Sequence, residues 1–344
     1  MEFFLKNLEM EEIMLKDRFF SELPVNCDLA SEAHALLRGD KDIEIPGVKE
    51  EISTKKFTKI TKITIINDEG ARIMGRPKGQ YITIDAPMVT EDFAAMEEAA
   101  FATANAIGEL VTKHISSNRH TPILICGLGN ERVTADALGP EVIKKSLSTR
   151  QFFLSSPEDV LGKYRSIVLL RTDVLANTGM EAAEIIAAAA NQINASAIIV
   201  IDALAALGAE RLGTSFQISD CGITPGAGLG NIRSAINRET MGIPVIALGV
   251  PTVIRMSTLI DQIIAHHEPS LEHQHNNSEG DAPAGASPKE ITNSILMKQR
   301  EHFAVTPKDI DHVIEKAAST LAVGLHIALH QAIDQTNYHE YINV

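Results

Sequence analysis

The stretch SAIIVID, residues 196–202, decides the fold that we predict for this chain of 344 residues. Its apolar side chains follow one another without polar alternation, which is typical of a strand buried on both faces of a sheet. Helical stretches near 140–148 and 180–193 flank this run. Three more runs have the same character: PILIC at 122–126, SIVLLR at 166–171 and IPVIALG at 243–249. Buried strands that alternate with helices predict an α/β fold, with a mostly parallel sheet flanked by helices.

Further elements are predicted on both sides of this block. Residues 57–85 favour strands joined by a turn, and Thr90 favours the start of a long, alanine-rich helix. Near the C-terminus, Thr306 and Pro307 are residue types preferred at the N-cap and the first position of a helix. The apolar face of that helix would run from Ile310 to Leu329.

Two segments are expected to lie outside the packed domain. Residues 1–28 carry mixed charge and clustered Phe and Met before Pro24, so we interpret them as a detachable leader. Residues 262–290 are polar, with three prolines and a tail rich in Gly, Ala and Ser. That composition predicts a long loop or disordered insertion. The remainder, 29–344, is predicted to form a single domain.

Composition excludes several classes of function. Lys and Arg total 31 against 45 Asp and Glu, which gives a net charge of −14, so an anionic nucleic acid is not an expected partner. No run of 18 uninterrupted apolar residues exists, and the acidic N-terminus does not resemble a signal peptide. The three cysteines are too few for a disulfide scaffold or a zinc module. These features predict no membrane association and a reducing, cytoplasmic location.

Two aspartates are placed where an open parallel sheet binds ligands. Asp136 lies beyond the strand at 122–126, and Asp202 follows SAIIVI directly. Ligands bind outside the carboxyl ends of parallel strands, so both carboxylates would reach one cleft if the strands are neighbours. Two such groups could share a proton, with one activating water and the other polarising a carbonyl. Either aspartate could instead cap a helix or close a turn.

Glycine-rich segments are the second candidate feature. SDCGITPGAGLGN, residues 219–231, could let a bound peptide chain approach its backbone closely. The segment GLGN at 127–130 lacks the third glycine of a dinucleotide fingerprint, and neither segment has the ending of a P-loop. Tight loops are the alternative interpretation of both. The substrate-binding residues predicted from these segments are Asn130, Gly222, Gly226, Gly228 and Gly230.

Histidines suggest a metal site less clearly. His326, His330 and Asp334 share a helix face by their spacing, but the glutamate of a zinc-peptidase motif is missing between them. Helix packing is therefore the favoured interpretation, and no metal or cofactor is predicted.

Five motifs together resemble the germination protease family of endospore-forming bacteria: GLGNERVTADALGP, IDALAA, QISDCGITPGAGLGN, GIPVIALGVPTV and the terminal stretch from VTPKDID to IDQ. The resemblance implies an atypical aspartic endopeptidase that degrades small acid-soluble spore proteins during germination. It implies a fold like that of hydrogenase-maturation proteases, no cofactor and a homotetramer in the spore core. It also implies that Asp136 and Asp202 are the catalytic pair.

The resemblance further implies a zymogen that removes its own leader. Family members are cut within an acidic residue, a large apolar residue, Ala, a small residue and Glu, a pattern that residues 28–32 match. The predicted cut lies between Asp28 and Leu29. Asn26 and Cys27 depart from the family's Arg-Thr upstream of the cut, and Asp173 adds a charge near the expected cleft.

Two rival functions remain open from the sequence. The first is a metal-dependent peptidase resembling hydrogenase-maturation enzymes, with one or both aspartates as ligands. The second is a non-catalytic α/β module that binds a phosphorylated ligand through its glycine loops.

Overall fold

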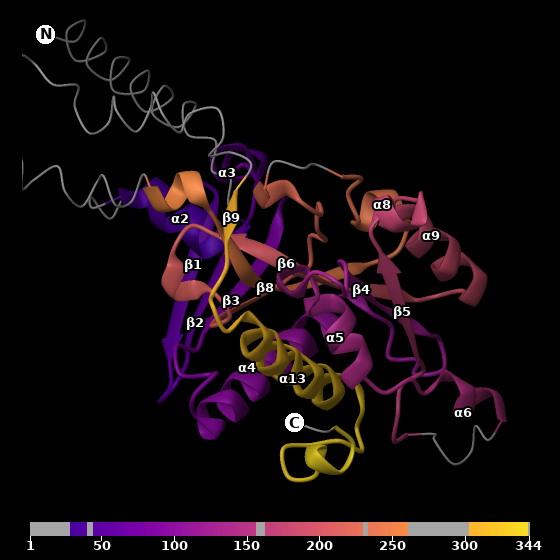
Figure 1. Cartoon of the computed structure of the whole chain (residues 1–344). Coiled ribbons are helices and arrows are strands. Elements are labelled where there is room, and N and C mark those ends of the chain that lie inside the picture. Colours follow the sequence, from indigo (N-terminus) through magenta and orange to yellow (C-terminus); the bar gives the residue numbers. More distant parts are fainter. Residues whose placement is uncertain (1–27, 40–43, 156–161, 230–232, 261–302, 343–344) are drawn as a thin grey trace, which may run out of the picture.

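The computed structural model describes residues 28–39, 44–155, 162–229, 233–260 and 303–342 (Figure 1). Its centre is one nine-stranded sheet in the order β1-β2-β3-β7-β8-β6-β4-β5, with β9 paired to β8. The strands are β1 (Val48–Thr54), β2 (Lys59–Ile65), β3 (Gly79–Asp85), β4 (Ile123–Leu128), β5 (Ile167–Asp173), β6 (Ala197–Ala206), β7 (Ser215–Ser219), β8 (Val245–Arg255) and β9 (Ala304–Val305).

The parallel sheet predicted from the apolar runs is confirmed for β4, β5, β6 and β8, which pair in parallel. The other half of the sheet is antiparallel, because β7 pairs antiparallel with β8 and continues through β3, β2 and β1. Thus β8 is the seam between the two halves. The strands β1 and β7 were not predicted, since both are short and mix polar with apolar residues.

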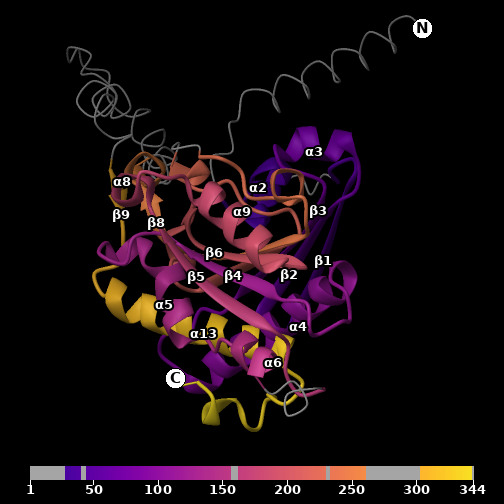
Figure 2. The same cartoon turned by 90° about the vertical axis from the view of Figure 1, so that its right-hand side faces the viewer.

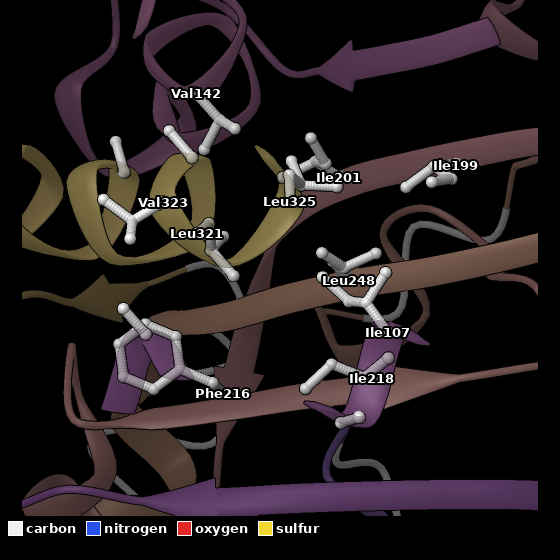
Figure 3. Close-up of a cluster of buried hydrophobic side chains, with 14 of the residues drawn as sticks. Ile107, Val142, Ile199, Ile201, Phe216, Ile218, Leu248, Leu321, Val323 and Leu325 are labelled. Carbon is white, nitrogen blue, oxygen red and sulfur yellow. The ribbon is translucent and has the colours of Figure 1, made fainter. Parts of the chain in front are cut away.

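Helices cover both faces of the sheet (Figure 2). They are α2 (Ala30–Arg38), α3 (Asp68–Met74), α4 (Phe93–His114), α5 (Leu138–Lys145), α6 (Arg150–Ser155), α8 (Leu175–Thr178), α9 (Ala182–Ile193), α10 (Arg238–Met241) and α13 (Ile310–Leu329). Helices α4, α5 and α13 bury one face in a single large cluster, to which β6, β7 and β8 contribute Ile199, Phe216 and Leu248 (Figure 3).

The opposite face carries two smaller clusters. One joins β4, β6 and β8 to α9, and the other joins β2 and β3 to α2 and α3. Ala30, Ala33 and Leu37 bring α2 into the second of these clusters. Two cavities lie between these clusters. Residues of β6, β7 and β8 line them on this face of the sheet.

Three predicted boundaries are wrong in detail. Residues 57–85 form β2 and β3 as expected, but α3 lies between them because the Asn67 side chain caps its start. The long helix begins after Asp92 instead of Thr90, because the Asp92 side chain accepts hydrogen bonds from the amides of Ala94 and Ala95. Thr306 is not an N-cap: its hydroxyl donates to the Thr252 carbonyl, and α13 begins three residues after Pro307.

Two predicted segments lie outside the described residues. The leader is described only from Asp28 onward, and the segment 262–290 falls within the range 261–302. Among the residues that are described, no helix is both long and apolar enough to cross a membrane.

Candidate active site

Asp202 lies inside β6, just beyond the last residue that pairs with the parallel strand β4. Pairing between β6 and β4 stops at Ile201, whereas β6 itself runs on to Ala206 beside β8. The prediction that the strand ends at Asp202 is therefore wrong by four residues. At this position β6 is no longer paired with β4, and Asp202 lines the cavity that lies there. Asp202 is buried, with 7% of its surface exposed, and it accepts a 2.9 Å hydrogen bond from the Ala203 amide.

Asp136 is delivered to the same place by the turn after β4. It ends the short 3₁₀ helix Thr134–Asp136 that precedes α5. The amide of Asn130 donates to its carboxylate at 2.8 Å. Gly129 allows this turn to be tight: it has φ of 103°, and a Cβ there would lie 2.0 Å from the Asp136 carbonyl oxygen. Asn130 thus contacts Asp136, although it is predicted to bind substrate.

Both aspartates line one cavity of about 480 Å³. Asp28, Asp173 and Glu181 line it as well, so five carboxyl groups surround a common space, together with the guanidinium of Arg233. Among the described residues, no three His, Cys, Asp or Glu side chains are grouped so that they could hold a metal ion. The carboxyl groups that line the cavity give it the composition of an acid–base site.

Burial and the charges of neighbouring carboxylates raise the pKa of both Asp202 and Asp136. Burial raises the pKa of Asp202 well above its ordinary value, and the charges of Asp136 and Asp28 raise it further. Burial also raises the pKa of Asp136, but the Asn130 amide opposes this by stabilising the ionised form. Asp202 is the more deeply buried, so it keeps its proton to higher pH than Asp136 does.

Asp28 is bound at the rim of this cavity. Its amide donates to the Ala205 carbonyl at 3.2 Å, and its carboxylate accepts from the Ala205 amide at 2.8 Å. Gly228 lies against the same carboxylate: a Cβ on this glycine would come within 2.1 Å of Asp28 Oδ2. The chain beside the predicted cut is therefore seated on the extension of β6 that also carries Asp202.

Glu32 anchors the same segment one helical turn later. The amides of Leu207 and Gly208 donate to its two carboxylate oxygens, each at 2.9 Å. Arg211 lies 3.5 Å from this carboxylate and also pairs with Asp85 at 2.7 Å. Sequence reasoning names Glu32 only through the family pattern and gives no partner for it.

The predicted glycines are distributed over two cavities. Gly226 lines the cavity that holds the aspartates, and Gly222 lines a second cavity of about 300 Å³ next to it. Asp28 lines both cavities. Gly228 lies against the Asp28 carboxylate, and Gly230 lies outside the described residues.

His326 on α13 and His330, which caps the end of this helix, form a buried structural pair away from this cavity. The rings of His326 and His330 stack 5.4 Å apart, and each accepts a hydrogen bond from a backbone amide, that of Leu147 and of Arg165 respectively. Burial lowers the pKa of His326 to about 4 and that of His330 to about 3, so both stay neutral. Helix α13 ends at Leu329, and Asp334 therefore does not share its face, contrary to the prediction.

Comparison with known proteins identifies the family. The sequence model of the germination protease family matches residues 27–302. The germination protease of Clostridium perfringens (strain ATCC 13124) is 36% identical over 93% of this chain and 99% of its own length. That of Priestia megaterium (strain ATCC 12872) is 33% identical over 95% of this chain and 100% of its own length.

Among solved structures, the [NiFe] hydrogenase maturation protease HycI from Thermococcus kodakarensis KOD1 matches 40% of this chain and 76% of its own. The TM-score is 0.27 at 19% identity, which is too low to support an argument about fold or function. The assignment rests on the sequence comparisons alone. They show that this chain belongs to the germination protease family.

Proposed function

We propose that the chain uses Asp136 and Asp202 to hydrolyse small acid-soluble spore proteins. Its family makes it a spore-germination endopeptidase. The substrate and the two catalytic residues are our inference. The observation that supports them most strongly is the cavity that both aspartates line beside a seated peptide segment.

In the proposed mechanism, one aspartate acts as a base and the other as an acid. Ionised Asp136 takes a proton from water, whose oxygen attacks the carbonyl carbon of the peptide. Protonated Asp202 supplies a proton to the reaction, and the C–N bond breaks as the leaving nitrogen becomes an amine. One water is consumed, and the products are a carboxylic acid and an amine. Gly226, Gly228 and neighbouring backbone groups would hold the peptide.

The same site would also remove residues 1–28. Asp28 is already seated at the cavity rim, and its peptide bond to Leu29 is the bond that we propose is cut. Leu29 is fully buried, so the segment after the cut is fixed in place as well. The mature protein would then begin at Leu29.

The decisive experiment is to incubate the full chain with a purified small acid-soluble spore protein and to map every cut by mass spectrometry. We expect cleavage after an acidic residue. Cleavage that is abolished by a chelator and restored by a divalent metal would instead support the metal-dependent rival. Tight nucleotide binding without any cleavage would support a binding module.

Removal of the Asp173 charge is expected to extend activity to lower pH. The charge of Asp173 raises the pKa of Asp136, so Asp173→Asn lowers that pKa and leaves the base ionised further into the acid range. Asparagine also tolerates the φ of 58° at this position. The acidic limb of the cleavage-rate profile should therefore move to lower pH. Glu131→Gln is the control, since Glu131 is exposed and pairs with Arg171. An acidic limb that stays in place would contradict the assignment of Asp136 as the base.

Assembly and location are also proposals. The homotetramer and the spore-core cytoplasm are inferred from the family resemblance. Light scattering of the purified chain tests the first, and imaging of a tagged chain in sporulating cells tests the second.

A further inference from the structure

Gln217, on β7, brackets the peptide bond that we propose is cut. Its side-chain Nε2 donates to the carbonyl oxygen of Asp28 at 2.8 Å. Its Oε1 accepts from the amide of Ala30 at 2.6 Å. One carboxamide therefore holds the backbone on both sides of Leu29, and its donor half is directed at the carbonyl group of the Asp28–Leu29 bond.

The sheet places Gln217 opposite Asp202. Both residues pair in register with Gly249 of β8, one from each side of the seam. Residues paired across neighbouring strands project from the same face, so Asp202 and Gln217 point to the same side of the sheet, where Asp202 lines the first cavity and Gln217 lines the adjoining one. Two strand spacings separate their backbones by about 10 Å. Gly249 places no side chain of its own between them, and the Leu204 side chain lies over it.

We propose that Gln217 is a catalytic residue of this peptidase, whose carboxamide N–H stabilises the negative charge that forms on the carbonyl oxygen during attack by water. This inference rests on the proposed cut after Asp28. As the water oxygen bonds to the carbonyl carbon, the C=O electron pair moves to oxygen, where the Gln217 donor is already in place. When the tetrahedral intermediate collapses, the pair returns and the C–N bond to Leu29 breaks. The donor keeps its proton throughout.

Capping of helix α2 explains only half of this geometry. The Oε1 of Gln217 satisfies the amide of Ala30, the first residue of α2, and so supports the start of that helix. Such a cap needs an oxygen and no donor. The Nε2 contact with the carbonyl of Asp28 is what a stabiliser of the developing oxyanion requires.

The variant Gln217→Glu separates these two roles. It keeps an oxygen for Ala30 and replaces the donor by an oxygen that is ionised at neutral pH. Loss of one oxyanion donor typically costs about 10²–10³-fold in rate. The measurement is the first-order rate constant for release of residues 1–28 from the full chain, at several protein concentrations to show that cleavage is intramolecular. We expect a loss of this size at pH 7.

The pH profile provides a readout that a role limited to the Ala30 contact would not move. Protonation of the carboxylate introduced by Gln217→Glu restores a donor O–H, so the rate of this variant relative to wild type should rise as pH falls. Taking the ratio at each pH cancels the titration of the groups common to both proteins. The titratable or charged groups that line the two adjoining cavities are Asp28, Arg76, Tyr81, Asp136, Asp173, Glu181, Asp202, Cys221 and Arg233.

Two further variants complete the test. Gln217→Ala has no donor at any pH, so its relative rate should stay low throughout. Gln80→Glu is the matched control, because Gln80 lies on β3 and contacts Lys113 and Glu109. It should cleave like wild type at every pH. A wild-type rate for Gln217→Glu at pH 7, or a ratio that does not change with pH, would overturn the proposal.

The outcomes also separate the role of Gln217 from the proposed function. If wild type is cut elsewhere, or if Asp202→Asn still processes itself at Leu29, the proposed function fails. If wild type is cut at Leu29, Asp202→Asn is not, and Gln217→Glu matches wild type, only the role of Gln217 fails.

Discussion

Asp202→Asn and Asp136→Asn are each expected to lower the rate of peptide cleavage by about 10²–10⁴-fold while the protein remains folded. Asparagine keeps the shape of each side chain but can neither hold nor release the catalytic proton. The measurement is kcat on a spore-protein substrate, together with a circular dichroism spectrum. Near-wild-type cleavage by either folded variant would rule out the two-aspartate mechanism.

The Asp202→Asn variant should also make the fold more stable at neutral pH. Burial raises the pKa of Asp202 in the folded state above its unfolded value of about 3.9. The folded state therefore becomes less stable as pH rises through that unfolded value, and Asp202→Asn removes this cost. Its Tm at pH 7 should exceed that of wild type by about 1–2 °C for each kcal/mol recovered, because the entropy of unfolding scales with chain length. Below about pH 3.9 the two should differ little. Asp68→Asn, at an exposed position, is the control.

Full-length protein is expected to convert itself to a form that begins at Leu29, and the Asp202→Asn variant is expected not to convert. Both ends of the proposed cut are fixed, since Asp28 is bound by Ala205 and Glu32 by the amides of Leu207 and Gly208. N-terminal sequencing after incubation provides the measurement. A Leu29 start in Asp202→Asn as well would mean that another protease makes the cut.

Conversion is also expected to speed up as pH falls, down to the acidic limb where Asp136 becomes protonated. Burial raises the pKa of Asp28, and protonation removes one negative charge from a cavity that Asp136, Asp173 and Asp202 share. Less negative charge there favours the seated segment and the negative transition state. Asp28→Asn keeps an oxygen for the Ala205 amide but has no charge to lose, so its rate should depend less on pH. An equal pH dependence in this variant would show that another group is responsible.

Local patterns in the sequence predict only part of this site. The unbroken apolar run before Asp202 predicts a buried strand, and the turn after PILIC places Asp136 beside it, because both signals are local. Gln217 belongs to β7, which the sequence pattern presents only as the approach to a glycine loop. Its importance arises from pairing with Gly249 and contact with Asp28, and both depend on segments far apart in the sequence. Non-local pairing of this kind leaves no periodic signal.

Burial of Leu29 beside the cavity governs how the leader would leave after the proposed cut. Hydrolysis would turn a neutral amide into a carboxylate on Asp28 and an ammonium on Leu29, whose pKa is ordinarily about 8. The cavity without Asp28 stays net acidic, because Asp136, Asp173, Glu181 and Asp202 outnumber Arg233, so it repels the first and attracts the second. Charge repulsion would thus favour dissociation of the severed peptide. The new ammonium group of Leu29 would stay in the cavity and balance part of its negative charge. The cavity would then become accessible to a substrate protein only when the peptide departs, and not at the moment when the bond breaks.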